Sequence, residues 1–269
     1  MKTRTITMKI MTFTGSKGGV GKTTILFNYA AWLAQNNYTV LLIDGDFQAN
    51  LSSTFKTITN ENTLLDVFRG GTPEIRHVAD HIDLLPASPN LDQVEGLIQN
   101  KMYREYVLME WMRKNADTIK SYDFIMIDTH PEFGLLTKNM IAVSDSVIVP
   151  LEPSEYGFQQ LKTQFELRMA EYREDSIDPR TGESDIDAHV YFVGNKIQHN
   201  TSESRIFREA LSEMDNVIGL INFREVMKKA LSLKQAVVDM SDEKLRNYKG
   251  YKEHLDTQFS NMTDRILHD

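Results

Sequence analysis

A glycine-rich segment enclosed by two lysines is the strongest chemical signal in this sequence. Residues 15–24 read GSKGGVGKTT and follow a short apolar run. Glycine allows the backbone to turn its N–H groups inward around an anion, and a helix that begins there adds the positive end of its dipole. In this position a lysine reaches the β and γ phosphates of a nucleotide, and a threonine hydroxyl joins the shell of Mg²⁺. The spacing predicts a P-loop, with a glycine-rich turn of no chemical function as the alternative.

Individual residues of this loop can be given roles. Lys22 is expected to contact the phosphates, and Thr23 to join the Mg²⁺ shell. The residues expected to bind phosphate are Gly18, Gly19, Val20, Gly21, Lys22, Thr23 and Thr24. Ser16 stands where the G-x-x-x-x-G-K-[ST] pattern has its first glycine, so the ordinary Walker A interpretation is incomplete.

Three aspartates follow apolar runs at points where a carboxylate can meet the phosphates. Asp44 and Asp46 come after YTVLLI, and Asp128 comes after FIMI. Doubly wound sheets bind ligands at the carboxyl ends of their strands, where a carboxylate can hold Mg²⁺ directly or through water. The expected metal ligands are Thr23, Asp44 and Asp128. The alternative is that these acids only cap turns or helices.

Short apolar runs mark the elements that position these residues. Near-continuous runs, typical of strands buried on both faces, lie at residues 10–13, 40–43, 82–85, 124–127, 147–149 and 190–193. Apolar residues with helical spacing follow the first run and recur late in the chain. Strands that alternate with helical crossovers form a mostly parallel sheet. The sequence therefore predicts an α/β fold, a doubly wound P-loop sheet flanked by helices, in a single domain over residues 1–269.

Composition excludes several classes of function. The chain has 269 residues, no cysteine and a formal net charge of −8. Without cysteine it has no disulfides, thiolate metal sites or cysteine nucleophile. The N-terminal residues MKTRTITMKIM contain no apolar signal-peptide core and no run is apolar enough to span a membrane, so we expect a cytoplasmic protein. The acidic balance restricts any nucleic-acid binding to a local basic surface.

The phosphate loop and several further segments together resemble one known family. KGGVGKTT, with Lys17 inside the loop, resembles the deviant Walker A motif of the ParA/MinD family of ATPases. LLIDGDFQAN resembles its switch I segment, and YDFIMIDTHPEFG its Walker B and switch II. IDLLPAS, DSVIVPLEPSEYG and a late NK pair fall in the family's order. The resemblance covers about residues 9–240, leaves a C-terminal helical tail at about 241–269, and is greatest to small ParA-type DNA-partitioning ATPases.

This resemblance implies an ATPase that uses ATP and Mg²⁺ and forms a homodimer on ATP binding. In the family two subunits sandwich two ATP molecules, and the signature lysine, here Lys17, contacts the phosphates bound by the other subunit. Asp46 resembles the switch I carboxylate that positions the attacking water, and Asp128 resembles the Walker B acid, with Asp44 supporting the Mg²⁺ shell. The expected catalytic residues are Lys17, Lys22 and Asp46.

The base of the nucleotide is expected near the end of a later strand. Asn195 and Lys196 follow VYFVG and resemble the family's adenine-contacting position, where an Asn amide can pair with the donor and acceptor edge of the base. The family often has a proline-bearing loop near the base, whereas INFREVMKK has none. Phe223 either stacks on adenine or belongs to the core.

Two positions in the switch segments depart from the family pattern. Phe47 stands where ParA proteins commonly have proline, and His130 precedes Pro131 where two prolines are usual. His130 is either a sensor of the γ-phosphate or a packed switch residue.

A late basic segment carries the expected contact with DNA. Residues 224–234, REVMKKALSLK, contain four basic residues and one acidic residue. ParA-like ATPases bind DNA without sequence preference through basic residues in this region, so the resemblance implies that Arg224, Lys228 and Lys229 contact DNA; a solvated helix face is the alternative. The family role then predicts DNA partitioning, nucleoid association in the ATP state, and a ParB-type partner that stimulates hydrolysis.

A MinD-like ATPase that cycles on and off a membrane is the alternative function. It requires a short basic amphipathic helix at the C-terminus. Here the tail from Lys244 mixes acidic residues with its bases, so we expect no membrane binding.

Overall fold

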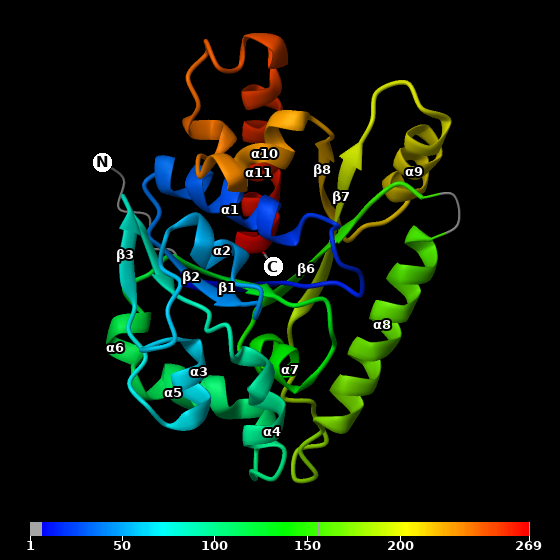
Figure 1. Ribbon diagram of the computed structural model, residues 1–269. Helices are drawn as coiled ribbons and strands as arrows, with labels where there is room; N and C mark the ends of the chain where they lie inside the picture. Colours follow the sequence, from blue (N-terminus) through cyan, green and yellow to red (C-terminus); the bar gives the residue numbers. More distant parts are fainter. Residues whose placement is uncertain (1–6, 155–156, 269) are drawn as a thin grey trace.

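The computed structural model describes residues 7–154 and 157–268, and one eight-stranded sheet forms its centre (Figure 1). The strands lie in the order β3-β4-β2-β5-β1-β6-β7-β8, and neighbours pair in parallel except β3 with β4. Their bounds are β1 (Lys9–Phe13), β2 (Val40–Gly45), β3 (Arg76–Ala79), β4 (Ile82–Leu85), β5 (Phe124–Thr129), β6 (Ser146–Leu151), β7 (His189–Ile197) and β8 (Val217–Asn222). Each of the six predicted runs lies within one of these strands.

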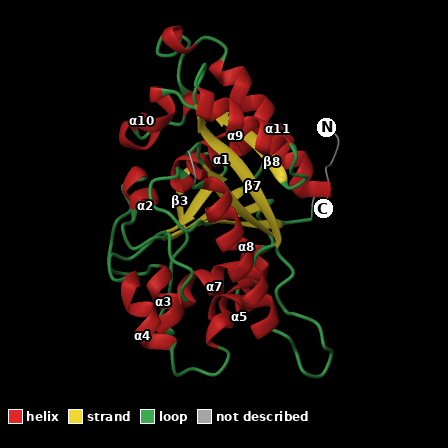
Figure 2. Ribbon diagram, turned by 90° about the vertical axis from the view of Figure 1, so that its right-hand side faces the viewer, coloured by secondary structure: helices red, strands yellow, loops and turns green. Residues whose placement is uncertain are grey.

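Helices cover both faces of the sheet (Figure 2). The α-helices are α1 (Lys22–Gln35), α2 (Asn50–Thr54), α3 (Leu64–Arg69), α4 (Val94–Ile98), α5 (Val107–Lys114), α6 (Ala116–Ile119), α7 (Leu135–Ala142), α8 (Phe158–Asp175), α9 (Ser202–Ser212), α10 (Glu225–Leu233) and α11 (Tyr251–His268). Short 3₁₀ turns are η1 (Leu91–Gln93), η2 (Arg104–Tyr106), η3 (Val237–Asp239) and η4 (Arg246–Tyr248). Within the described part of the chain, no helix is long and apolar enough to cross a bilayer.

Alternate residues of the central strands supply two separate apolar layers. In β5, Met126 packs in the cluster that includes side chains of α1, α10 and α11. Ile125 and Ile127 pack on the other face, in the cluster with α3, α5 and α7. Since both faces are buried, a near-continuous apolar run is what such a strand requires. The predicted class, a mostly parallel α/β sheet flanked by helices, is confirmed.

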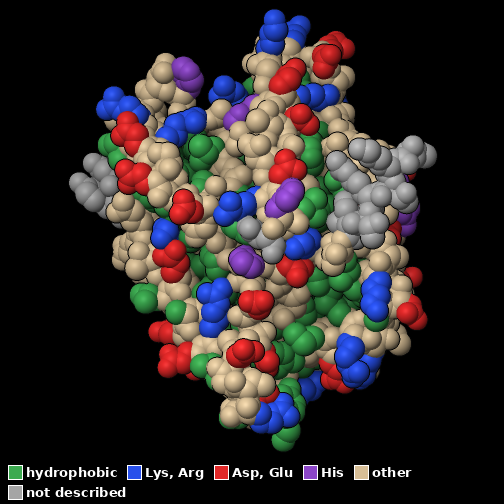
Figure 3. Space-filling model, turned by 180° about the vertical axis from the view of Figure 1, so that it is seen from behind, with side chains coloured by type: hydrophobic (Ala, Val, Ile, Leu, Met, Phe, Trp, Pro, Cys, Tyr) green, Lys and Arg blue, Asp and Glu red, His purple; other side chains and the backbone are tan. Residues whose placement is uncertain are grey.

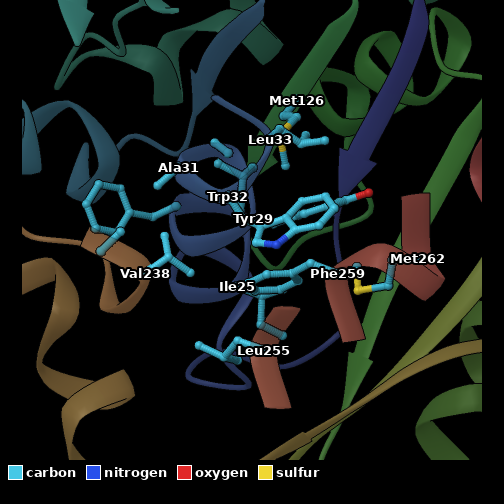
Figure 4. Close-up of a cluster of buried hydrophobic side chains, with 14 of the residues drawn as sticks. Ile25, Tyr29, Ala31, Trp32, Leu33, Met126, Val238, Leu255, Phe259 and Met262 are labelled. Carbon is cyan, nitrogen blue, oxygen red and sulfur yellow. The ribbon is translucent and has the colours of Figure 1, made fainter. Parts of the chain in front are cut away.

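The last long helix is part of the core. Phe259 on α11 stacks on Tyr29 of α1 with ring centroids 5.1 Å apart, and it lies beside Trp32 (Figure 4). Two side-chain hydrogen bonds join the same helices: Trp32 Nε1 donates to Asp256 at 2.8 Å, and the hydroxyls of Tyr29 and Thr263 lie 2.8 Å apart. The apolar side of α11 is thereby used in packing against α1 and β8.

Strand register brings the carboxyl ends of β1, β2 and β5 together. Asp44 of β2 lies opposite Asp128 of β5, and Asp128 lies opposite Phe13, the last residue of β1. The glycine-rich loop begins directly after β1 and leads into α1. The predicted phosphate loop and the predicted carboxylates therefore meet at one edge of the sheet.

Replacement of Phe259 tests whether α11 belongs to the core. Its side chain is fully buried, so Phe259→Ala is expected to lower the free energy of unfolding by about 3–5 kcal/mol. Leu167 on α8 is 59% exposed, and Leu167→Ala should change stability by no more than about 0.5 kcal/mol. Urea denaturation followed by circular dichroism measures both. Equal stability of the two variants would contradict the packing described for α11.

Candidate nucleotide site

The loop between β1 and α1 requires glycine for two reasons. Gly19 and Gly21 have φ angles of +77° and +97°, in the region that side chains disfavour. A Cβ on Gly21 would also lie 2.3 Å from Asn195 Nδ2. Helix α1 begins at Lys22, immediately after this turn, so its unpaired N–H groups face the loop. The local structure is that of an anion-binding cradle.

A cavity of about 290 Å³ lies between this loop and the ends of β2 and β5. Loop residues form one wall, and the segments that follow the two strands form the other. Its lining consists of Gly18, Gly19, Gly21, Lys22, Thr23, Thr24, Asp46, Gln48, Asn50, His130, Pro131 and Leu231. Most of the predicted phosphate-binding residues therefore lie around one space, together with Asp46.

Lys22 is the buried cation of this site. Burial lowers the pKa of its ammonium group, while the charges of Asp128 and Asp46 act in the opposite direction. The two carboxylates thereby offset part of the cost of burying the ammonium charge. The amide cradle and Lys22 together present donors and positive charge to a single anion.

The two buried acids differ in how their oxygens are used. Ser52 donates to Asp44 Oδ2 from its N–H at 2.8 Å and from its hydroxyl at 2.6 Å, and the Asp46 N–H reaches Asp44 Oδ1 at 3.2 Å. Asp128 Oδ2 accepts from the Thr23 hydroxyl at 2.5 Å. Asp128 Oδ1 is buried and has no hydrogen-bond partner within the described residues. Asp128 thus has a buried oxygen available for a ligand.

Burial and repulsion between neighbouring acids make both carboxyl groups hold their protons more tightly. Burial raises the pKa of Asp44 to about 6. Burial, followed by the charge of Asp44, raises the pKa of Asp128 to about 8. A cation placed here would relieve both effects, and Mg²⁺ usually needs only one or two protein carboxylates when phosphates complete its shell. Residues 7–154 and 157–268 hold no cluster of three or more His, Asp or Glu that could bind a metal ion. The donor set of Thr23 and Asp128, with Asp44 nearby, fits Mg²⁺.

Lys17 lies outside the cavity and has a partner that the sequence did not reveal. Its Nζ contacts Glu152 Oε1 at 2.8 Å, and its side chain is 52% exposed. Lys196 Nζ contacts the other oxygen of Glu152 at 2.7 Å and the Gly19 carbonyl at 2.6 Å. Burial would raise the pKa of Glu152, but the two lysines outweigh it and hold that pKa below its usual value. Glu152 follows β6 at the same sheet edge, a position that could have marked it.

Asn195 and Lys196 brace the loop from β7. Asn195 Nδ2 donates to the Val20 carbonyl at 2.7 Å, so this amide group already has a protein partner. Both residues line a second cavity of about 270 Å³ that shares Gly19, Gly21 and Thr24 with the first. The remaining lining residues are Asn222, Phe223, Arg224, Met227 and Lys228. Two adjoining cavities that share one glycine loop suit a ligand with a phosphate part and a flat organic part.

The three basic residues expected to contact DNA do not share one environment. Arg224 and Lys228 line the second cavity. Lys229 lies 3.6 Å from Glu225, an ion pair one helical turn apart on α10. Their contact with DNA stays a prediction.

Comparison with known proteins agrees with this geometry. A family model described as an AAA domain matches residues 8–175. The chromosome partitioning protein ParA of Myxococcus xanthus is 35% identical over 159 residues, which are 57% of this chain and 55% of that protein. The sporulation initiation inhibitor protein Soj of Bacillus subtilis is 32% identical over 166 residues, 57% of this chain and 62% of that protein. The chain belongs to the ParA/MinD family of P-loop ATPases.

The alignments with these two family members span little more than half of each relative's length. A solved structure extends the similarity of fold to nearly the whole chain. This chain superposes on a substituted McdA of Cyanothece, solved in complex with ATP, with a TM-score of 0.79. The superposition covers 97% of each chain, and the two sequences are 18% identical. At that identity the likeness concerns the ParA/MinD fold alone.

Substitution of Gly21 tests the phosphate cradle of this ParA/MinD protein. Gly21→Ala places a methyl group against Asn195, and alanine disfavours the positive φ of this position. The affinity for Mg²⁺–ATP should therefore fall at least about tenfold, which corresponds to about 1.4 kcal/mol. Gly182 has a similar φ of +75° with nothing within 4 Å of an added Cβ, so Gly182→Ala is the matched control and should bind normally. Calorimetry measures affinity, and circular dichroism verifies folding. Normal binding by folded Gly21→Ala would contradict this role.

Proposed function

We propose that this protein is a ParA-type DNA-partitioning ATPase that binds Mg²⁺–ATP, pairs with a second copy of itself and hydrolyses ATP to ADP and phosphate. The observation that carries the proposal is the cavity in which the glycine loop, buried Lys22 and Asp46 meet. Beside it lies an oxygen of Asp128 that has no hydrogen-bond partner among the described residues. This arrangement supplies fixed donors, positive charge and a metal-binding oxygen in one place.

Phosphate binding is assigned to Gly18 through Thr24, with Lys22 as the fixed cation. Thr23, Asp44 and Asp128 are assigned to Mg²⁺, which when bound offsets charge on the phosphates. Asp128 and Thr23 offer oxygens for it, while Asp44, whose oxygens already accept hydrogen bonds, contributes its charge. Adenine is assigned to the second cavity, beside Asn195, Lys196 and Phe223.

Asp46 is assigned to the attacking water. It lines the phosphate cavity and its carboxylate can accept a hydrogen bond from water, which orients the oxygen toward phosphorus. Lys22 stabilises the charge on the transferring group in the same subunit. Lys17, exposed at the rim, is assigned to the phosphates of the paired subunit, where it completes the catalytic site.

Partitioning is the biological role best supported by the relatives, since the Myxococcus protein is named as a chromosome partitioning ParA. In this proposal the protein is cytoplasmic, and its ATP-bound dimer binds DNA without sequence preference through Arg224, Lys228 and Lys229. The dimer is thereby associated with the nucleoid. A ParB-type partner stimulates hydrolysis and release. Figure 3 shows lysine and arginine side chains interspersed with acidic ones on one face of the molecule.

The MinD-like alternative requires an amphipathic C-terminal helix that is free to insert into a lipid interface. The apolar residues of α11 are instead buried against α1 and β8, among them Leu255, Phe259 and Met262. This packing uses the apolar residues of α11 in the core and so argues against the MinD-like alternative.

Removal of Lys17 separates nucleotide binding from pairing. Lys17→Ala should bind ATP with an affinity within about threefold of wild type, because the Lys17 side chain lies outside the phosphate cavity of its own subunit. The same variant should lose ATP-dependent dimerisation. Lys114, another exposed lysine in an ion pair, is remote in the sequence, and Lys114→Ala is the control that should dimerise normally. Sedimentation velocity with and without Mg²⁺–ATP measures pairing. Unchanged dimerisation of Lys17→Ala would defeat the assignment of the signature lysine.

Co-sedimentation with DNA and with anionic liposomes tests the biological role. With ATP, but not with ADP, the protein should pellet with DNA of any sequence, and binding should weaken steeply between about 50 and 200 mM salt. Lys229, which lies outside the lining of both cavities, gives the test of DNA contact. Lys229→Ala should reduce the slope of log affinity against log salt by about one, whereas Lys114→Ala should not. ATP-dependent pelleting with liposomes and not with DNA would select the MinD-like function.

A further inference from the structure

The two residues that depart from the family pattern lie against each other. Phe47 follows the end of β2 and His130 follows the end of β5, and their ring centroids are 4.1 Å apart with planes inclined by 34°. His130 Nδ1 also lies 3.1 Å from Asp46 Oδ1. The side chains of His130 and Asp46 are 18% and 10% exposed. The two switch segments are thus joined by one imidazole that contacts both.

The direction of the hydrogen bond follows from the chemistry of its partners. A carboxylate only accepts, so the imidazole donates from Nδ1. Asp46 Oδ1 accepts a second hydrogen bond from the Gln48 N–H at 2.9 Å. Over the described residues, both hydrogen bonds to this carboxylate end on Oδ1. Oδ2 therefore keeps its capacity to accept a hydrogen bond inside the cavity that Asp46 lines.

We propose that His130 is a positioning residue for hydrolysis: it fixes Asp46 by Oδ1, so that Oδ2 accepts the hydrogen bond of the attacking water. Phe47 holds the imidazole by ring contact, and the Gln48 N–H completes the support. This inference rests on the proposed function, because it deepens the role of Asp46 there. It assigns to His130 a task that acts through Asp46, without contact between His130 and the nucleotide.

The charges around Asp46 explain why a support is needed. Lys22 attracts this carboxylate, while the neighbouring acids Asp44 and Asp128 repel it. The attraction to Lys22 acts to turn the carboxylate toward the ammonium group, and the hydrogen bonds of His130 and the Gln48 N–H at Oδ1 oppose that turn. A neutral or charged imidazole that donates from Nδ1 supplies direction without filling the space at Oδ2.

Two amide substitutions distinguish positioning from packing. In His130→Asn the side-chain NH₂ occupies about the place of Nδ1, whereas in His130→Gln it reaches the place of Nε2. We expect His130→Ala and His130→Gln to reduce the single-turnover rate of ATP hydrolysis about tenfold or more, with ATP affinity unchanged, and His130→Asn to recover most of that rate. His77, which pairs with Asp83 through Nδ1 at 2.9 Å on the sheet edge, gives the matched control: His77→Ala should hydrolyse ATP at the wild-type rate.

The outcomes are separable. Absence of hydrolysis by the wild-type protein refutes the proposed function, and the inference falls with it. A wild-type rate in His130→Ala, or a loss in ATP affinity that accounts for the whole effect, refutes the positioning role and leaves the proposed function standing. Equal losses in His130→Asn and His130→Gln refute it as well, because they indicate packing.

A spectroscopic measurement on the nucleotide-free protein tests the geometry without activity. Imidazole ¹⁵N shifts should show His130 protonated at Nδ1. Asp46→Asn removes the obligate acceptor, and the Nδ1 resonance of His130 should move while that of His77 does not. An Nδ1 of His130 that carries no proton in the wild-type protein would overturn the inference.

Discussion

Two carboxyl groups buried side by side at the ends of β2 and β5 are the constraint on which the rest of this structure depends. Asp44 and Asp128 stand opposite each other in the parallel ladder, where burial and neighbouring negative charge raise the cost of ionising them. Such a pair destabilises a folded protein unless cations compensate it. Lys22 supplies part of that compensation. It is incomplete at Asp128 Oδ1, which has no hydrogen-bond partner in the part of the chain that the structure describes. A bound cation would lower the pKa of Asp128 again and offset the repulsion between the two acids, so the acidic pair favours a metal-bound state.

The topology determines which groups can meet at this pair. In a parallel sheet all carboxyl ends lie at one edge, so each strand delivers its following residue to the same region. β1 delivers the glycine loop, β2 and β5 the acids, β6 Glu152 and β7 Asn195. Asn195 and Lys196 donate to the carbonyls of Val20 and Gly19, so β7 supports the loop that α1 continues.

The sequence predicted the parts of this site that depend on local pattern. Strands buried on both faces, the glycine turn and the acids that follow apolar runs are short-range features, and the structure brings the turn and the acids together at the carboxyl ends of β1, β2 and β5. The pairing of Lys17 with Glu152 joins residues 135 positions apart, so no local pattern could reveal it. The apolar pattern does not predict strand β3, because its sequence RHVA is short and partly polar. β3 lies at the antiparallel edge of the sheet, where a strand is not buried on both faces and needs no continuous apolar run. The hydrogen bond from the Asn195 amide to the Val20 carbonyl likewise joins residues far apart in the sequence, so no local pattern could reveal it. The contact of Asn195 with adenine stays a prediction.

The contact between Lys17 and Glu152 bears on how pairing could depend on nucleotide. A half-exposed ion pair is worth only about 0–1 kcal/mol, so it can be exchanged at little cost for a contact with a more highly charged group. In the proposed dimer that group is the triphosphate of the other subunit, and Lys196 stays to neutralise the Glu152 that Lys17 leaves. Without nucleotide the same exchange would leave Lys17 without an anion and so would not favour pairing. In this proposal, the weakness of the contact within one chain is what lets the charge of a bound nucleotide decide between the single and the paired state.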